Sequence, residues 1–126
     1  MATAEPTLLA ANIKFHTNDD DKNEDTHLTV VVRDEEGNIA ARIDDDFGLF
    51  KDQSDSGPFD LELLNKAQKV KLRSGTVEIR IDPENTDVWK FNYFLDLLFT
   101  DESHLTSEAQ GLRLSEVDKQ QQFAIA

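Results

Sequence analysis

Residues 89–99 read Trp-Lys-Phe-Asn-Tyr-Phe-Leu-Asp-Leu-Leu-Phe, the richest apolar alternation in this 126-residue chain. From Trp89 onward every second residue is large and apolar, which is the period of a strand with one buried face. On the opposite face Phe94 and Leu98 indicate partial burial on both sides, as in a central strand. Periodicity alone also permits a helix here, but the aromatic content favours a strand. This stretch therefore predicts the central strand of a β-sheet core.

Shorter alternations of the same period occur along the rest of the chain. They cover residues 12–17, 28–34, 39–43, 59–63, 70–72, 76–81, 112–114 and 123–125. The turn Asp34-Glu-Glu-Gly-Asn38 joins the second and third of them as a hairpin, and residues 100–110 are expected to form a polar connection. Seven to nine short strands with turns between them predict an all-β fold, an antiparallel β-sandwich. We expect residues 1–11 to be a flexible tail and residues 12–126 to form a single β-sandwich domain.

Composition limits the class of protein. Hydrophobic residues make up 38% of the chain and charged residues 31%, which indicates a globular protein rather than a disordered one. Cysteine is absent, which excludes disulfides and thiolate metal sites and leaves the redox compartment open. The apolar run at residues 8–11 is too short for a membrane span and lacks the basic flank of a signal peptide. We therefore expect a soluble chain without an export signal.

The net charge of −13 argues against nucleic-acid binding, because nucleic acids are recognised by basic clusters. The basic residues are locally concentrated at Lys66, Lys69, Lys71 and Arg73. We interpret this patch as an edge strand carrying lysines that prevent edge-to-edge pairing.

Three acidic segments follow predicted strands. Residues 18–27 hold five carboxylates against one lysine, and residues 44–46 and 82–87 are also acidic. Crowded carboxylates repel one another, and an oxygen-seeking cation relieves that repulsion. If the fold brings these loops to one rim, we expect Ca²⁺ to bind there. The candidate ligands are Asp19, Asp21, Asn23, Asp25, Asp44, Asp45, Asp46, Asp82 and Asp87.

Other metal motifs fit less well. The first loop has the alternating acidic spacing of an EF-hand, but Glu24 stands where glycine is needed and Val30 where a bidentate glutamate belongs. A zinc site drawn from His16, His27 or His104 is disfavoured because these histidines are scattered in polar segments. The alternative to calcium is an acidic loop that is simply solvated.

The order of these elements resembles the PLAT domain, a lipid- and protein-binding sandwich found in lipoxygenases and alpha-toxin. The features that carry the resemblance are Asp25-Thr-His-Leu-Thr-Val30, the loop ending Ser54-Asp-Ser-Gly-Pro-Phe59, the strand 76–81 entering an acidic loop, and Trp89 soon after it. The resemblance covers roughly residues 12–99. The family's usual Gly-Thr-Asp approach to its second strand is replaced by Glu-Asp-Thr at 24–26. The resemblance implies a calcium-assisted targeting module without catalysis.

Two apolar groups have alternative interpretations. Phe47, Leu49 and Phe50 either tuck under their loop or lie exposed at a binding rim, and tucking is the commoner case. Trp89 and Tyr93 could form a sugar platform, but their strand spacing within an apolar run favours the core. No nucleophile elbow or glycine-rich phosphate loop is present in the sequence, so we do not expect an enzyme.

Three functional classes remain. The first is a calcium-binding module that bridges its acidic loops to a membrane surface or to a protein partner. The second is a calcium-dependent carbohydrate-binding module or lectin, with a glycan as ligand. The third is a structural sandwich that calcium only stabilises.

Overall fold

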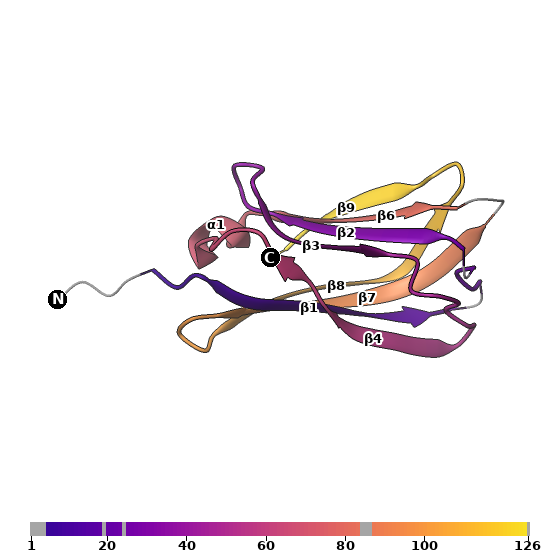
Figure 1. Ribbon diagram of the computed structural model, residues 1–126, viewed down its shortest axis with the longest axis horizontal. Coiled ribbons are helices and arrows are strands. Elements are labelled where there is room, and N and C mark those ends of the chain that lie inside the picture. The colour runs from indigo at the N-terminus through magenta and orange to yellow at the C-terminus, as the bar shows by residue number, and fades with distance from the viewer. Residues whose placement is uncertain (1–4, 19, 24, 84–86, 126) are drawn as a thin grey trace.

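A computed structural model describes residues 5–18, 20–23, 25–83 and 87–125. These residues form two antiparallel sheets stacked face to face (Figure 1). The first sheet consists, in spatial order, of β4 (Ser54–Asp60), β1 (Leu8–Thr17), β7 (Val88–Phe99) and β8 (His104–Ser115). The second consists of β5 (Glu62–Leu63), β3 (Ile39–Asp45), β2 (His27–Arg33), β6 (Thr76–Asp82) and β9 (Gln120–Ala124). The predicted all-β sandwich is confirmed.

The core lies between the sheets and is centred on β7. Its burial alternates strictly along the strand, and β7 pairs with β1 on one side and β8 on the other. Trp89 stacks on Phe91 at 3.9 Å between ring centroids and meets Phe15 edge-on at 5.2 Å. Trp89 Nε1 also donates a hydrogen bond to Thr17 Oγ1 at 3.1 Å, so the indole is buried with its polar atom satisfied. The interpretation of this stretch as a core strand is confirmed.

The expected strand at 70–72 is wrong. The chain forms the short helix α1 (Lys69–Arg73) there, and Leu72 is fully buried while Val70 is exposed. The alternation of lysine with apolar residues imitates a strand, but Lys, Leu and Arg are good helix formers. The basic patch that we interpreted as an edge strand therefore lies on and beside a helical turn at one end of the sandwich.

Residues 100–110 are not only a polar connection. Strand β8 begins at His104 and continues through Ser115, so the expected short strand at 112–114 is the last part of a longer one. Because β8 is at the edge of its sheet, it tolerates the polar residues that made it look like a loop. Two other strands also start earlier than expected, β1 at Leu8 and β4 at Ser54.

The loops after β1, β3 and β6 lie at the same end of the sandwich, at the right of Figure 1, and α1 lies at the other end. At the loop end Phe50 is buried at 3% exposure and Phe47 packs on Phe59 at 4.6 Å between centroids. Leu49 is 46% exposed. Tucking is therefore correct for the two phenylalanines. Within the described ranges no helix is long and apolar enough to cross a membrane.

The first prediction concerns Trp89. Trp89→Ala should lower the free energy of unfolding by about 3–5 kcal/mol, because it leaves a large cavity among stacked rings. Thermal and urea unfolding monitored by far-UV circular dichroism measure the loss. Phe94→Ala is the matched control, since this ring lies on the outer face of the same strand. An unchanged unfolding midpoint for Trp89→Ala would show that the indole is not part of the core.

Candidate functional site

The three acidic loops meet at one rim, as the calcium hypothesis requires. Two backbone hydrogen bonds of 3.1 Å join Lys22 of the first loop to Phe50. Phe50 belongs to the segment between β3 and β4, residues 46–53, which continues the second acidic segment and is called the second loop. Asp87, at the end of the third loop, accepts hydrogen bonds from the Asn23 N–H at 3.1 Å and from the Thr26 hydroxyl at 2.6 Å. Hydrogen bonds from described residues of all three loops therefore hold the rim together.

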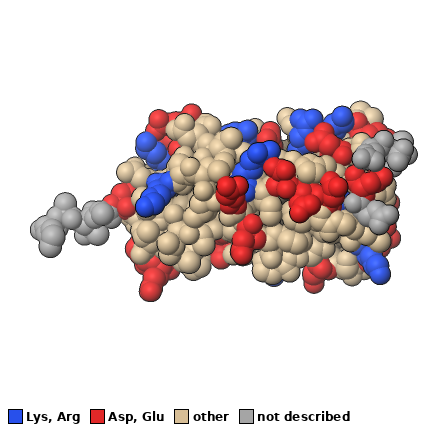
Figure 2. Space-filling model, in the orientation of Figure 1, with Lys and Arg blue, Asp and Glu red and all other residues tan. Residues whose placement is uncertain are grey.

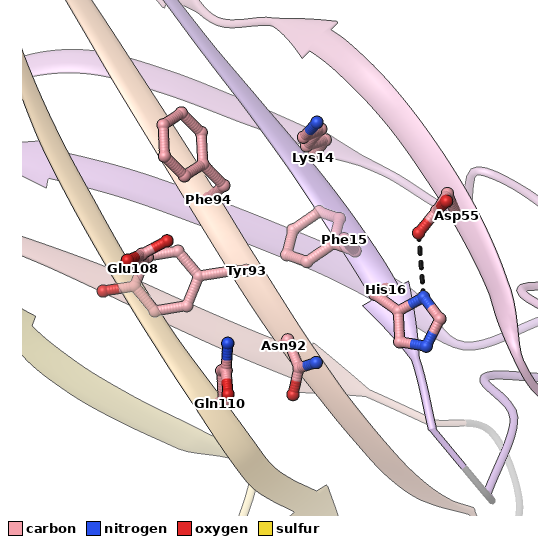
Figure 3. A pocket seen from close by; sticks show the side chains of 9 residues that line it. All are labelled: Lys14, Phe15, His16, Asp55, Asn92, Tyr93, Phe94, Glu108 and Gln110. Carbon is pink, nitrogen blue, oxygen red and sulfur yellow. Dashed lines mark hydrogen bonds and ion pairs between the residues drawn. The ribbon is translucent and has the colours of Figure 1, made fainter.

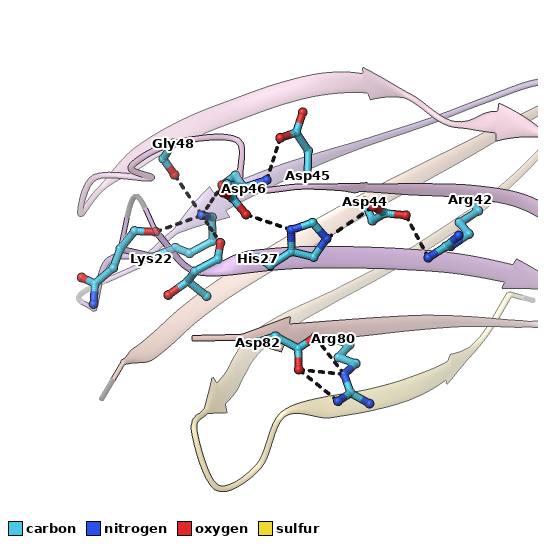
Figure 4. A network of polar contacts seen from close by, with 11 residues as sticks. Lys22, His27, Arg42, Asp44, Asp45, Asp46, Gly48, Arg80 and Asp82 are labelled. Carbon is cyan, nitrogen blue, oxygen red and sulfur yellow. Dashed lines mark hydrogen bonds and ion pairs between the residues drawn. The ribbon is translucent and has the colours of Figure 1, made fainter. Parts of the chain in front are cut away.

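The centre of this rim is occupied by a lysine side chain. Lys22 is fully buried, and its Nζ donates to the carbonyl oxygens of Asn23 at 3.0 Å and Thr26 at 2.9 Å, both in the first loop. From the second loop it reaches the carbonyl oxygens of Asp46 at 2.6 Å and Gly48 at 2.9 Å (Figure 4). Burial lowers the pKa of this ammonium below its ordinary value of 10.5, and nearby carboxylates, Asp87 first, oppose that shift.

Most of the predicted ligands already have protein partners. Asp44 pairs with Arg42 at 2.9 Å, Asp46 with His27 at 2.8 Å, and Asp82 with Arg80 at 3.0 Å (Figure 4). The Arg80 hydrogen bond holds the pKa of the Asp82 carboxyl below its usual 3.8.

The remaining predicted ligands are spread over the rim. Asp45 is exposed and accepts the backbone N–H of Asp46 at 2.7 Å, and Asn23 contributes its carbonyl oxygen to Lys22. Asp25 is half-buried in the first loop, and Asp19 lies outside the described residues. In the part of the chain that the structure describes, no group of three or more His, Asp or Glu side chains could hold a metal ion. These described residues therefore do not fit an all-carboxylate calcium site.

Asp21 is the predicted ligand whose carboxyl group interacts with several other carboxylates. Burial raises the pKa of its carboxyl above 3.8, and the charges of Asp52, Asp87 and Asp20 raise it further. Figure 2 shows a dense group of acidic side chains on the half of the face nearer the three loops. The outer part of the rim thus retains the carboxylate repulsion that the sequence predicts.

A pocket of about 280 Å³ opens on the outer face of the first sheet (Figure 3). Phe15 and Tyr93, which point into the core, contribute to its floor. Its other lining residues project outward from four neighbouring strands. They are Lys14, His16, Asp55, Asn92, Phe94, Glu108 and Gln110.

Local pairing orients these side chains. His16 Nδ1 lies 2.8 Å from Asp55 Oδ1, and Lys14 Nζ lies 6.0 Å from the centroid of the Phe94 ring. At Asn92 the register between β7 and β8 shifts, and the Asn92 side-chain oxygen accepts the backbone N–H of Gly111 at 2.9 Å. Gly111 has a φ of 68°, which glycine adopts readily. Bulges of this kind re-aim side chains next to binding sites.

No protein-family model, curated protein or solved structure matches this chain. The resemblance to PLAT domains therefore remains a prediction.

Sequence reasoning missed the roles of three residues at this end of the molecule and on the sheet face. Lys22 was visible as the one lysine among five carboxylates of the first loop, but no local pattern indicates that its side chain is buried. Phe94 was expected to be partly buried, but its place in the lining of a pocket was not predicted. The sequence feature that could have indicated it is an aromatic residue on the polar face of an alternating strand. Asp52 was missed because nothing in the sequence indicates that it lies near Asp21.

The second prediction concerns Asp21. Because its pKa is raised in the folded state, protonation stabilises the fold fully below pH 3.8, and that contribution is lost as the pH rises through the raised pKa. Asp21→Asn removes the charge at every pH. It should therefore raise Tm by roughly 1–4 °C at pH 7 and low salt, with the gain shrinking as the pH falls through the raised pKa and vanishing near pH 3.8.

Thermal melts of both proteins across the pH range measure this difference. Asp60→Asn, at an exposed position at the end of β4, is the matched control and should change Tm little. An Asp21→Asn gain of equal size at every pH would contradict the charge-crowding explanation.

Proposed function

We propose that this chain is a non-catalytic binding module that holds a neutral carbohydrate in the sheet-face pocket. The observation that carries this proposal is the lining. A half-buried aromatic ring, Phe94, lies among side chains that donate and accept hydrogen bonds. An aromatic face packs against the apolar side of a sugar ring, and amides and carboxylates bind its hydroxyl groups.

Charge and size favour the same class of ligand. The outward lining mixes Lys14 and His16 with Asp55 and Glu108, so the pocket has no single strong sign of charge. The net charge of −13 repels anionic ligands at long range. A volume of about 280 Å³ lies just below the usual range of ligand pockets, roughly 300 to 1,000 Å³, and suits a single polar ring of an oligosaccharide.

The pocket is built on strands, which supports binding without a large rearrangement. Lys14 and His16 are on β1, Asn92 and Phe94 on β7, and Glu108 and Gln110 on β8. Cross-strand pairs fix these positions, since Lys14 lies opposite Phe94 and Phe94 opposite Glu108. No outward lining residue belongs to the first or third acidic loop, and we therefore expect carbohydrate binding without calcium.

The third prediction tests this site. The wild-type protein should be retained by a neutral glycan on an array, and Phe94→Ala should weaken binding roughly tenfold, or about 1.4 kcal/mol, because the stacking face is lost. Isothermal titration with the best glycan, in EDTA and again in calcium, measures the change.

Leu98→Ala is the matched control, because Leu98 lies on the outer face of β7 beyond the pocket. It should bind like the wild type. Loss of binding in EDTA would contradict calcium independence. Equal binding by Phe94→Ala, or no retention on any neutral glycan, would contradict the proposed pocket.

A second candidate function is the calcium-bridged one, which the PLAT resemblance implies. The specific observation that favours it is the crowding of Asp20, Asp21 and Asp52. Burial raises the pKa of Asp21 most, repulsion from the neighbouring carboxylates raises it further, and a divalent cation would relieve that repulsion. Because the described carboxylates form no group of three that could hold a metal ion, calcium would keep much of its water shell here and would bridge the acidic rim to an anionic membrane surface or protein partner.

The fourth prediction belongs to this candidate. Calcium at a hundredfold excess over its Kd would add about 2.7 kcal/mol to the folded state, which raises Tm by several degrees. Magnesium should do less because it keeps its water shell. The measurement is a melt in EDTA, calcium and magnesium at matched ionic strength, with sedimentation of anionic vesicles as the second readout.

The variant with both Asp21→Asn and Asp52→Asn should lose the response to calcium, and Asp60→Asn should keep it. Identical wild-type melting curves in EDTA and in calcium would show that the outer carboxylates are only solvated and do not bind calcium.

A further inference from the structure

The acidic rim contains a set of carbonyl oxygens arranged as they would be around a cation. Described residues of two loops supply four of them, and the distances from Lys22 Nζ run from 2.6 to 3.0 Å. Calcium–oxygen bonds are shorter, at about 2.3–2.6 Å. The spacing therefore suits an ammonium group, which is the group that is present.

The number of acceptors indicates that this nitrogen carries its charge. An ammonium has three N–H donors, whereas a neutral amine has two, and four carbonyl oxygens surround this one. The nitrogen also lies 4.9 Å from the centroid of the Phe50 ring, within the range of a cation–π contact. The protonated amine can therefore donate hydrogen bonds to more of the surrounding carbonyl oxygens than a neutral amine could.

The second loop bends in a way that brings its carbonyls to this point. Between Asp46 and Gly48, Phe47 has a φ of 58°, which a bulky residue rarely adopts, and Gly48 has a φ of 81°. Such strain persists only where surrounding contacts enforce it. Here the carbonyl oxygens on both sides of Phe47 accept hydrogen bonds from Lys22, and its ring packs on Phe59.

We infer that these loops form a cation site of backbone carbonyls that the chain fills with its own Lys22 ammonium. The lysine takes the place of the bound metal ion that a sandwich with acidic loops was expected to need. When the side chain is removed, the same site should accept a small alkylammonium ion. This inference does not rest on the carbohydrate pocket, and it leaves the outer carboxylates available to calcium.

Chemical rescue tests the inference. Lys22→Ala removes the atoms that propylammonium would restore, so its Tm should fall by about 10 °C or more in EDTA, and propylammonium should recover at least half of the loss with saturation. The probes are propylammonium chloride, 1-propanol as the uncharged analogue, and sodium chloride at matched ionic strength. Propanol and sodium chloride should recover little.

Two further variants act as controls. Lys22→Met keeps a long side chain near Phe50 but lacks the charge, so it should be destabilised and should not respond to propylammonium. Lys51→Ala removes an exposed lysine from the second loop and should behave like the wild type. A Lys22→Met protein as stable as the wild type, or no recovery of Lys22→Ala, would overturn the inference.

If Lys22→Ala does not fold, two other experiments test whether Lys22 fills the carbonyl site. Refolding with propylammonium, followed by Trp89 fluorescence, should restore the native signal. In the wild-type protein, amine acetylation should modify Lys51 at once and Lys22 only at the rate of unfolding. Equal labelling of these two lysines would overturn the inference.

Discussion

The hydrogen bonds from the Lys22 ammonium to backbone carbonyls are the interaction on which the loop end of this sandwich depends. A buried charge is costly unless it is paired or fully hydrogen-bonded, and the carbonyls of the first and second loops supply those bonds. In return the ammonium donates to carbonyl oxygens that are buried or partly buried, and one of them, the Asn23 oxygen, also accepts the Thr26 N–H at 3.2 Å. The side chain and the loops therefore stabilise each other, and neither arrangement is favourable alone.

This constraint extends from the loops to the strands. Strand β1 carries the pocket residue His16 and ends at Thr17, whose hydroxyl accepts the Trp89 N–H. The chain then enters the loop that contains Lys22. The Asn18 N–H bonds to the carbonyl of Lys90 at 2.8 Å, which ties the start of that loop to β7. These loop contacts thus fix the ends of β1 and β7, the two strands that carry most of the pocket lining. A sheet face built this way keeps the shape of its pocket, although it lies beside a rim of like charges.

The fold was predictable from sequence wherever burial was one-sided. The alternation at 89–99 and the hairpin through Gly37 identified strands because their buried faces repeat every second residue. The errors fall where that signal is ambiguous, at the helical turn around Leu72 and along the polar edge strand β8. Composition indicated three acidic loops, but not that an internal lysine occupies their centre. That position depends on contacts between residues distant in sequence, such as Lys22 and Gly48, which no local pattern encodes.

The central claim is that the Lys22 amine is protonated in the native protein and is enclosed by backbone carbonyl oxygens. Nitrogen-15 NMR of the side-chain amines of the uniformly labelled protein in EDTA tests it most directly. Protons of exposed ammonium groups exchange rapidly with water, whereas protected ones exchange only when the structure opens. The account predicts a distinct Lys22 Nζ signal with three bound protons and slow exchange, resolved from the other lysines at neutral pH. A Lys22 signal that exchanges as fast as that of Lys51, or one with only two bound protons, would contradict it.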